Sequence, residues 1–523
     1  MQMICLKKSI LLCIFLLFLL TTNAQVTIGS SQKPLEGALL QLKENENIDV
    51  NSFRGLGMPR VELEAIEKLD PCIPSDELVE GDKNIHVGLM VYNMTDKPPI
   101  GLCPGLHVWN GDKWIRLHGT CGIDPSLINA PNCYIVQPGG VSEEIPIAKA
   151  YLVSEERSDL TALNRSDKVS LEILWQDTEN LISNMDFVDG DKGILTKFKV
   201  TSNSGKSGNA VVAIHIGPNG NKENDPICWS WHIWVTDYDP ENGGTTYTHN
   251  NGEKDYTFMD RNLGATTTSN SDPSSMGMTY QWGRKDPFPA NLEFGDEPDF
   301  RVIYNAGNAE IYEIDELYTE STGTGIQHYE VTELKNLGKS ILNPMIYYYA
   351  KADDNDTNDT TADWFTTDDT GASGDNDLWG GISGGKSPFD PCPAGWKVPA
   401  MSSATKSPWT FESSGWGGGG VTIGSTGFTM TGLGFYPYGF PRFPRPVISC
   451  VGIPCVGQNY VGGAFVASAF WNSERGAYWT ATASTNNLAA RTSGIIGAGS
   501  PQPTFTNLDF SKAGGAYVRC VRE

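Results

Sequence analysis

Positive charge is scarce in this sequence. Its 523 residues include 38 Lys and Arg against 62 Asp and Glu, which gives a formal net charge of −24. A surface with this excess of negative charge repels the phosphate backbone of nucleic acids and the headgroups of anionic lipids. We therefore expect no nucleic-acid partner.

Sequence motifs for zinc are absent as well. None of the 11 cysteines is spaced as C-x-x-C and no H-E-x-x-H occurs, so neither a zinc ribbon nor a zincin is indicated. Cys5 and Cys13 lie in an N-terminal segment that we expect to be removed. An odd number of cysteines then remains, so at least one of them has no disulfide partner within the chain.

Long apolar runs are lacking except near the N-terminus. Lys7 and Lys8 precede the apolar run Ile10 to Leu20, and small residues lie before Gln25, a pattern typical of a cleavable secretion signal over residues 1–24. The alternative is a membrane anchor, which needs about 20 apolar residues, more than this run provides. We expect cleavage before Gln25, a secreted or cell-surface location (outer membrane-associated or extracellular), and no transmembrane segment in the mature chain.

Glycine and proline are abundant, with 57 and 31 residues, and 39% of the residues are hydrophobic. This composition is typical of a globular, loop-rich chain and favours a mainly β fold in several domains. The first domain, residues 25–118, has its clearest element at Val108 to Trp114, where Asn110 and Gly111 join two apolar pieces. Both turn residues of such a hairpin take positive φ. We predict a small strand-turn-strand module.

Residues 130–237 show the period-2 pattern of strands. Along the run that starts at Trp229, alternate positions place Trp229, Trp231 and Ile233 on one face. Short strands of this kind favour an immunoglobulin-like β-sandwich. We expect burial to alternate along this strand. We interpret His232, on the opposite face, as a sheet residue rather than a ligand or catalytic group, because no His or Cys lies at metal-binding spacing from it.

The last region, residues 245–523, contains several motifs in a fixed order. They are FDPCPAGWKVP at 389–399, GAYWTAT at 476–482 and YVRCVR at 517–522, preceded by MDRNLGA at 259–265 and YQWGRKDPF at 280–288. In order and spacing they resemble the Fibrobacter succinogenes major paralogous domain, which occurs in surface proteins of Bacteroidetes. The resemblance implies an α+β C-terminal domain with a C-type-lectin-like fold and a place at the cell surface, without a defined catalytic activity.

Two disulfides are expected in this region. A lectin-like fold brings its chain ends together, so the resemblance implies a bridge between Cys392 and Cys520. Such a bridge closes a loop of about 130 residues, for which loop-closure entropy predicts about 4–5 kcal/mol of stabilisation. Cys450 and Cys455 are expected to form a local bridge, because Gly and Pro between them bend the chain. Two buried thiols are the alternative for Cys392 and Cys520.

An acidic loop, Asp353 to Asp359, places oxygen ligands at alternating positions, and its candidate metal ligands are Asp354, Asp356 and Asn358. Calcium loops share this alternation, but the turn Gly and the bidentate Glu of an EF-hand are lacking. The lectin-type calcium and sugar signature is missing too, because a serine follows Trp471-Asn472 where a carboxylate is expected. A solvated acidic loop is the preferred interpretation and calcium binding is the alternative. No other cofactor is expected.

Aromatic residues crowd the Gly- and Pro-rich segment Ser413 to Arg475. Aromatic rings on such a segment stack on sugar faces or anchor a protein partner, although packing within the fold explains them equally well. The candidate ligand contacts are Trp416, Tyr436, Tyr438 and Trp471.

These features indicate an exported surface protein that binds rather than catalyses, with adhesion to a glycan or protein ligand as its task. One alternative is a tip or accessory subunit of a surface fibre. Another is an enzyme of the formylglycine-generating type, which shares the lectin-like fold. The geometry of one cysteine pair distinguishes the enzyme from the binding proteins. Bonded sulfurs at Cys392 and Cys520 favour a structural role, and a free, exposed pair favours chemistry.

Overall fold

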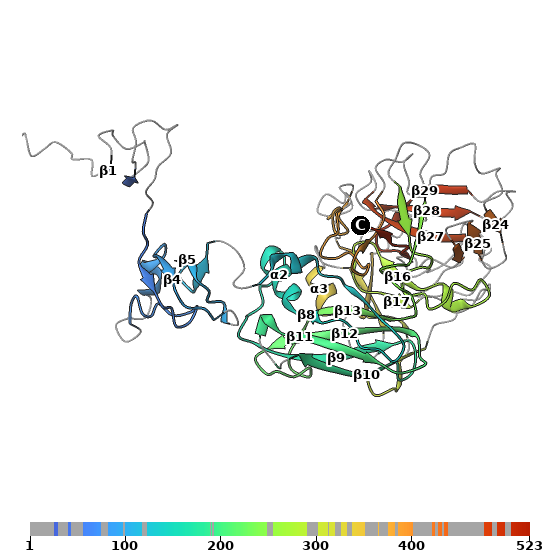
Figure 1. Cartoon of the computed structure of the whole chain (residues 1–523), viewed down its shortest axis with the longest axis horizontal. Coiled ribbons are helices and arrows are strands. Elements are labelled where there is room, and N and C mark those ends of the chain that lie inside the picture. Colours follow the sequence, from blue (N-terminus) through green and yellow to red (C-terminus); the bar gives the residue numbers. More distant parts are fainter. Residues whose placement is uncertain are drawn as a thin grey trace, which may run out of the picture. The chain divides into compact units, whose positions relative to one another are not determined.

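The computed structural model describes residues 26–29, 40–42, 56–74, 82–97, 100–117, 123–188, 190, 193–247, 255–289, 302–311, 313–318, 326–331, 337–350, 364–365, 375–381, 385–400, 421–423, 427–430, 434–437, 475–483, 489–496 and 504–523. Strands hold 36% of the structure and helices 11%. The chain is therefore mainly β, as its sequence predicts. It divides into two compact units (Figure 1), unit 1 with residues 1–96 and 103–118 and unit 2 with residues 97–102 and 119–523.

Unit 1 contains a four-stranded sheet in the order β3-β4-β5-β6 and a two-stranded pair, β1-β2. The elements are β1 (Val26–Ile28), β2 (Leu40–Leu42), β3 (Arg60–Val61), the 3₁₀ helix η1 (Asp82–His86), β4 (Met90–Asn93), β5 (Gly105–Trp109) and β6 (Trp114–Arg116). The strands β4, β5 and β6 are antiparallel, whereas β3 is parallel to β4 and β1 is parallel to β2.

The hairpin β5-β6 forms where the sequence predicts a turn, but its backbone differs from the expected one. Trp109 pairs with Trp114 across the turn. The Oδ1 atom of Asn110 accepts hydrogen bonds from the backbone nitrogens of Asp112 and Lys113 at 3.0 and 2.8 Å. Only Gly111 takes positive φ, at 110°. The expectation of two positive φ angles is therefore wrong, because the asparagine stabilises this turn through its side chain.

Unit 2 begins with a six-stranded sheet, β19-β18-β9-β12-β13-β7, and a three-stranded sheet, β10-β11-β8. The strands are β7 (Cys133–Val136), β8 (Ile145–Pro146), β9 (Lys168–Gln176), β10 (Ile182–Val188), β11 (Lys197–Ser202), β12 (Gly208–Gly217), β13 (Ile227–Val235), β18 (Ile303–Tyr304) and β19 (Glu310–Ile311). The helices here are η3 (Pro125–Asn129), α2 (Ala148–Glu156) and η4 (Gly193–Leu195). Phe198 and Trp231 join the two sheets, with ring centroids 5.2 Å apart.

The remaining described strands of unit 2 form the sheets β14-β15-β31-β23, β17-β16-β30-β27-β28-β29, β20-β21-β22 and β24-β25-β26. Their bounds are β14 (Thr245–Tyr247), β15 (Tyr256–Phe258), β16 (Met278–Gln281), β17 (Phe288–Pro289), β20 (Glu313–Tyr318), β21 (Ile326–Val331), β22 (Ile346–Ala350), β23 (Trp396–Lys397), β24 (Val421–Ile423), β25 (Gly427–Met430), β26 (Gly434–Pro437), β27 (Arg475–Ala483), β28 (Ala489–Ile496), β29 (Thr504–Ser511), β30 (Gly515–Tyr517) and β31 (Val521–Arg522). The helices are η5 (Pro273–Ser275) and α3 (Leu337–Leu342). No helix among the described residues has the length and apolar character needed to cross a bilayer.

Strand β13 is buried on both faces, so the expected alternation of burial along it is wrong. Every residue from Cys228 to Val235 is buried. Trp231 faces the three-stranded sheet. On the opposite face the indole nitrogen of Trp234 donates to the backbone oxygen of Ala265 at 3.2 Å. Residues from beyond position 245 thus cover the face that an isolated sandwich would leave in water (Figure 1).

Candidate functional site

One face of the unit 1 sheet carries the core of that unit. Val91, Trp109 and Trp114 are buried on this inner face. The rings of the two tryptophans lie edge to face, with centroids 5.5 Å apart. Their indole nitrogens donate to the backbone oxygens of Lys83 and Lys68 at 3.0 and 2.7 Å. Both rings are therefore packed and hydrogen-bonded within the unit.

Asn93 ties this core to the neighbouring segments. Its side chain is fully buried. The Oδ1 atom accepts from the backbone nitrogens of Leu63 and Thr95 at 3.1 and 3.0 Å. The Nδ2 atom donates to the backbone oxygens of Thr95 and Cys103, each at 3.0 Å. All four hydrogen-bonding positions of the amide are used, which explains why a polar side chain is stable at this buried position.

The opposite face of the same sheet is apolar and open to solvent. Tyr92, Leu106 and Ile115 are 38%, 39% and 36% exposed. The strand register and the backbone bond from the Leu117 nitrogen to the Leu106 oxygen set two rows of apolar side chains across this face: Met90, Val108 and Ile115 in one row, and Tyr92, Leu106 and Leu117 in the other. An antiparallel sheet with one face in water normally carries polar residues there. We call these six residues the outer face.

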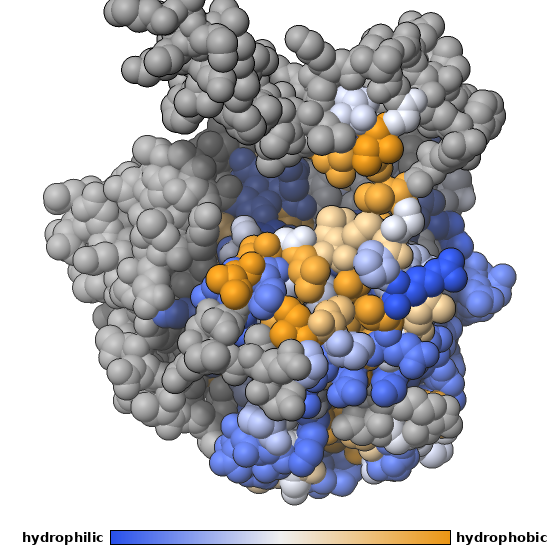
Figure 2. Space-filling model, turned by 90° about the vertical axis from the view of Figure 1, so that its left-hand side faces the viewer, coloured by the Kyte–Doolittle hydropathy of each residue, from blue (hydrophilic) through white to orange (hydrophobic). Residues whose placement is uncertain are grey.

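Exposed apolar side chains concentrate in unit 1. Figure 2 shows apolar side chains gathered in a patch on one face of the molecule. Among the described residues, the exposed large hydrophobic side chains are Ile28, Leu40, Leu42, Leu56, Ile85, Val87, Tyr92, Met94, Leu106, Ile115 and Leu117 in unit 1, and Val141 and Leu342 in unit 2. Contiguous apolar surface on a soluble protein marks a site of interaction.

Residues 27–131 match the family model of a phage tail like trimerisation region. The matched region contains all the exposed apolar side chains of unit 1 named above. It implies a β domain of a surface- or tail-type protein that associates with itself. No curated protein and no solved structure matches the chain. The resemblance of residues 245–523 to the Fibrobacter succinogenes major paralogous domain has no counterpart in these matches and stays a prediction.

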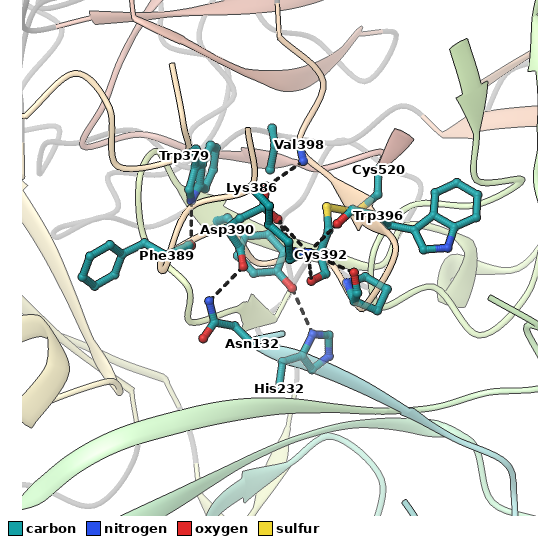
Figure 3. The surroundings of a disulfide bond; sticks show 12 residues. Asn132, His232, Trp379, Lys386, Phe389, Asp390, Cys392, Trp396, Val398 and Cys520 are labelled. Atoms are coloured by element: carbon teal, nitrogen blue, oxygen red, sulfur yellow. Dashed lines mark hydrogen bonds and ion pairs between the residues drawn. A yellow bond between two sulfur atoms is a disulfide. The ribbon is translucent and has the colours of Figure 1, made fainter. Parts of the chain in front are cut away.

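Outside the matched region, Cys392 and Cys520 of unit 2 form a disulfide (Figure 3), with an S–S distance of 2.08 Å. Both residues are fully buried. Trp396 of β23 pairs with Arg522 of β31, so the bridge links segments that already share a sheet. The bonded and buried pair has the geometry expected of a structural cross-link rather than of reactive thiols. Among the described cysteines, those with free thiols are Cys72, Cys133 and Cys228.

A buried ion pair holds the loop that carries Cys392 (Figure 3). Asp390 accepts from the backbone nitrogens of Cys392 and Val398 at 2.8 and 2.9 Å. The ammonium group of Lys386 lies 3.7 Å from the Asp390 carboxylate and donates to the backbone oxygens of Cys392 and Pro393, each at 2.9 Å. This network uses both carboxylate oxygens and anchors the backbone of the loop that carries Cys392.

Buried polar contacts also join residues 130–237 to the rest of unit 2. Asn132 donates to the backbone oxygen of Asp390 at 2.8 Å (Figure 3). On strand β13, Ser230 donates to the Asp286 carboxylate at 2.6 Å, and Lys285 pairs with the same carboxylate at 2.7 Å. Burial lowers the pKa of Lys285, and the charge of Asp286 opposes that shift. The boundary that the sequence places between residues 237 and 245 thus lies inside unit 2.

His232 has a structural role between the central sheet and β16. It bridges Asn209 of β12 and Tyr280 of β16. Asn209 uses its amide nitrogen to donate to Asp177 and Gly264, so its Oδ1 accepts from His232 Nε2 at 2.9 Å. The Nδ1 atom then accepts from the hydroxyl of Tyr280 at 3.0 Å. Burial lowers the pKa of His232 to about 3, so the ring is neutral at physiological pH. Within the described ranges no group of three His, Cys, Asp or Glu side chains gathers as metal ligands would.

Several predicted positions lie outside the described residues. They are the export signal 1–24, the aromatic candidates Trp416, Tyr438 and Trp471, the calcium candidates Asp354, Asp356 and Asn358, and the pair Cys450 and Cys455. Tyr436 lies on β26. All of these stay predictions.

The outer face is not among the sequence candidates, although the sequence contains a signal for it. In the run Leu89 to Tyr92, both sets of alternating positions are apolar. A strand of this type is covered on both faces. The pattern thus indicates that both faces of this strand are covered. It does not indicate whether this chain or another molecule covers the second face.

Proposed function

We propose that this chain is an exported surface or fibre-type protein that trimerises through residues 27–131 and uses unit 2 to bind a glycan or protein ligand at the cell surface. One observation carries the proposal. The region that matches a trimerisation family is also the region in which the exposed apolar side chains concentrate. A family match and an uncovered apolar surface are independent indications of the same property, which is self-association.

The pair β1-β2 supports self-association from a second place in the region. Ile28 pairs in parallel with Leu42, and the two side chains are 56% and 47% exposed. A two-stranded sheet is marginally stable by itself, and parallel strands are normally buried on both faces. Such a pair becomes stable when another chain covers it.

Unit 2 supports a binding role over a catalytic one. Its cysteine pair, which would have to be free for formylglycine-type chemistry, is bonded and buried. The network around Asp390 and the contacts of β13 hold a rigid framework, and loops on a rigid framework are the usual carriers of recognition. Adhesion, with this chain as a tip or accessory subunit of a surface fibre, fits both units.

The test uses the purified full chain on surfaces coated with glycans or matrix proteins, with and without calcium. Three linked binding modules raise the apparent affinity for a dense surface by about 10²-fold or more over that for the same ligand free in solution. We expect binding to at least one surface with this dependence on ligand density. Absence of binding to every surface, or equal affinity for dense and sparse surfaces, would contradict the proposal.

A further inference from the structure

We infer that the outer face of the β3-β4-β5-β6 sheet is the contact surface between copies of this chain, with three such faces meeting around a common axis. The inference rests on the proposed trimer and assigns the surface that forms it.

The first argument is that unit 1 does not need the outer face for its own core. Trp109, Trp114 and Asn93 already fill the inner face, with their polar atoms bonded to backbone groups of the same unit. The outer face nevertheless carries two rows of apolar side chains. An exposed row such as Tyr92, Leu106 and Leu117 contributes most when water is excluded from it.

The second argument concerns charge, because it decides which partner fits. Each chain carries a formal net charge of −24, so two copies repel one another over most of their surfaces. The six residues of the outer face are uncharged, and Arg60 lies beside Tyr92 at the edge strand β3. Copies can therefore approach closely at this face, whereas an anionic ligand finds a charged group only at its rim.

The third argument concerns symmetry. In a closed trimer each face contacts two neighbouring copies, so a broad surface serves better than a single protruding side chain. The outer face spans three neighbouring strands, β4, β5 and β6, in a fixed antiparallel register. Its two rows lie on one regular sheet, as packing against other sheets requires.

The experiment uses the full chain and four single variants. Leu106→Glu and Ile115→Glu each place a charge on the outer face, at side chains that are 39% and 36% exposed. The controls are Val141→Glu and Leu342→Glu in unit 2, where the side chains are 57% and 45% exposed. Near-UV circular dichroism checks that each variant is folded. Sedimentation gives the mass, and hydroxyl-radical footprinting gives the oxidation of Met90 and Tyr92.

We expect the wild-type chain and both controls to sediment as trimers in which Met90 and Tyr92 are protected from oxidation. Leu106→Glu and Ile115→Glu should sediment as folded monomers, with oxidation of Tyr92 increased at least threefold. If the wild type is a trimer and the outer-face variants stay trimeric with Tyr92 equally protected, the contact lies elsewhere. That result overturns the inference and leaves the proposed trimer intact. A monomeric wild type overturns both.

Discussion

Tyr92 and Leu106 lie opposite each other on neighbouring strands of unit 1, and both side chains are exposed. Cross-strand apolar pairs stabilise a sheet by about 0.2–1 kcal/mol each. Here the pair belongs to a row that continues to Leu117 on the same face. An apolar row on a sheet whose other face is already packed is the feature on which we base the proposed contact between copies of this chain.

The amide of Asn93 should be essential for unit 1. Asn93→Ala removes four hydrogen bonds to backbone groups of Leu63, Thr95 and Cys103. We expect a loss of about 2–4 kcal/mol, because each unsatisfied buried group costs about 1–3 kcal/mol. Hydrogen exchange at the Leu63 amide measures the local stability. Thr95→Val, which removes one bond to the Leu63 oxygen, is the matched control and should cost about 1 kcal/mol.

The disulfide between Cys392 and Cys520 should stabilise unit 2 by about 4–5 kcal/mol, since it closes a long loop in the unfolded chain. The two cysteines are 128 positions apart in the sequence. Thermal melting of Cys392→Ser, Cys520→Ser and the double variant should give the same lowered midpoint. The reduced wild-type chain is the control and should melt with the variants. An unchanged midpoint would show that the bridge contributes nothing to stability.

Tryptophans on both faces of β13 should contribute equally to the stability of unit 2. Trp231 faces Phe198, and Trp234 faces the segment around Ala265. Replacement of either by Ala should cost about 3–5 kcal/mol in chemical denaturation, as for other buried aromatic residues. If the sandwich were a separate domain with one face in water, Trp234→Ala would be nearly neutral. A large effect of Trp231→Ala with none from Trp234→Ala would therefore contradict the two-sided burial.

The low pKa of His232 in the folded chain should make unit 2 less stable in mild acid, because the ring takes up a proton when the chain unfolds. Its pKa is about 3 in the folded chain against an ordinary value of 6.5, so below pH 6.5 the unfolded state binds a proton that the native state does not. Above pH 6.5 this group therefore does not change the free energy of unfolding. Between pH 6.5 and pH 3 that free energy falls by about 1.4 kcal/mol for each pH unit. Denaturation curves of the wild type and His232→Gln should converge as the pH falls. Parallel pH dependence in the two proteins would disprove this role.

Local features of the fold could be predicted from the sequence. The mainly β class follows from composition, and the β5-β6 hairpin follows from Asn110 and Gly111 between apolar pieces. The resemblance to a known domain implies the pair Cys392 and Cys520, which the structure shows bonded. Each of these rests on a pattern that is short in sequence or already known as a unit.

The burial of a strand face by residues that are distant in the sequence could not be predicted in the same way. The run from Trp229 to Val235 has the period of a half-exposed strand, but its second face is covered by residues about Ala265 and Tyr280. Strand β18 joins the central sheet through Tyr304 and Gln176, which are far apart in sequence. The pattern of Leu89 to Tyr92 indicates a covering surface without indicating whether the same chain or another one supplies it.

The mass of the intact protein in solution tests the central claim most directly. Sedimentation equilibrium of the full chain, at several concentrations and at physiological salt, gives this mass without reference to shape. The account predicts about three times the mass of one chain, which is 56.9 kDa for all 523 residues. A single-chain mass at every concentration would contradict it.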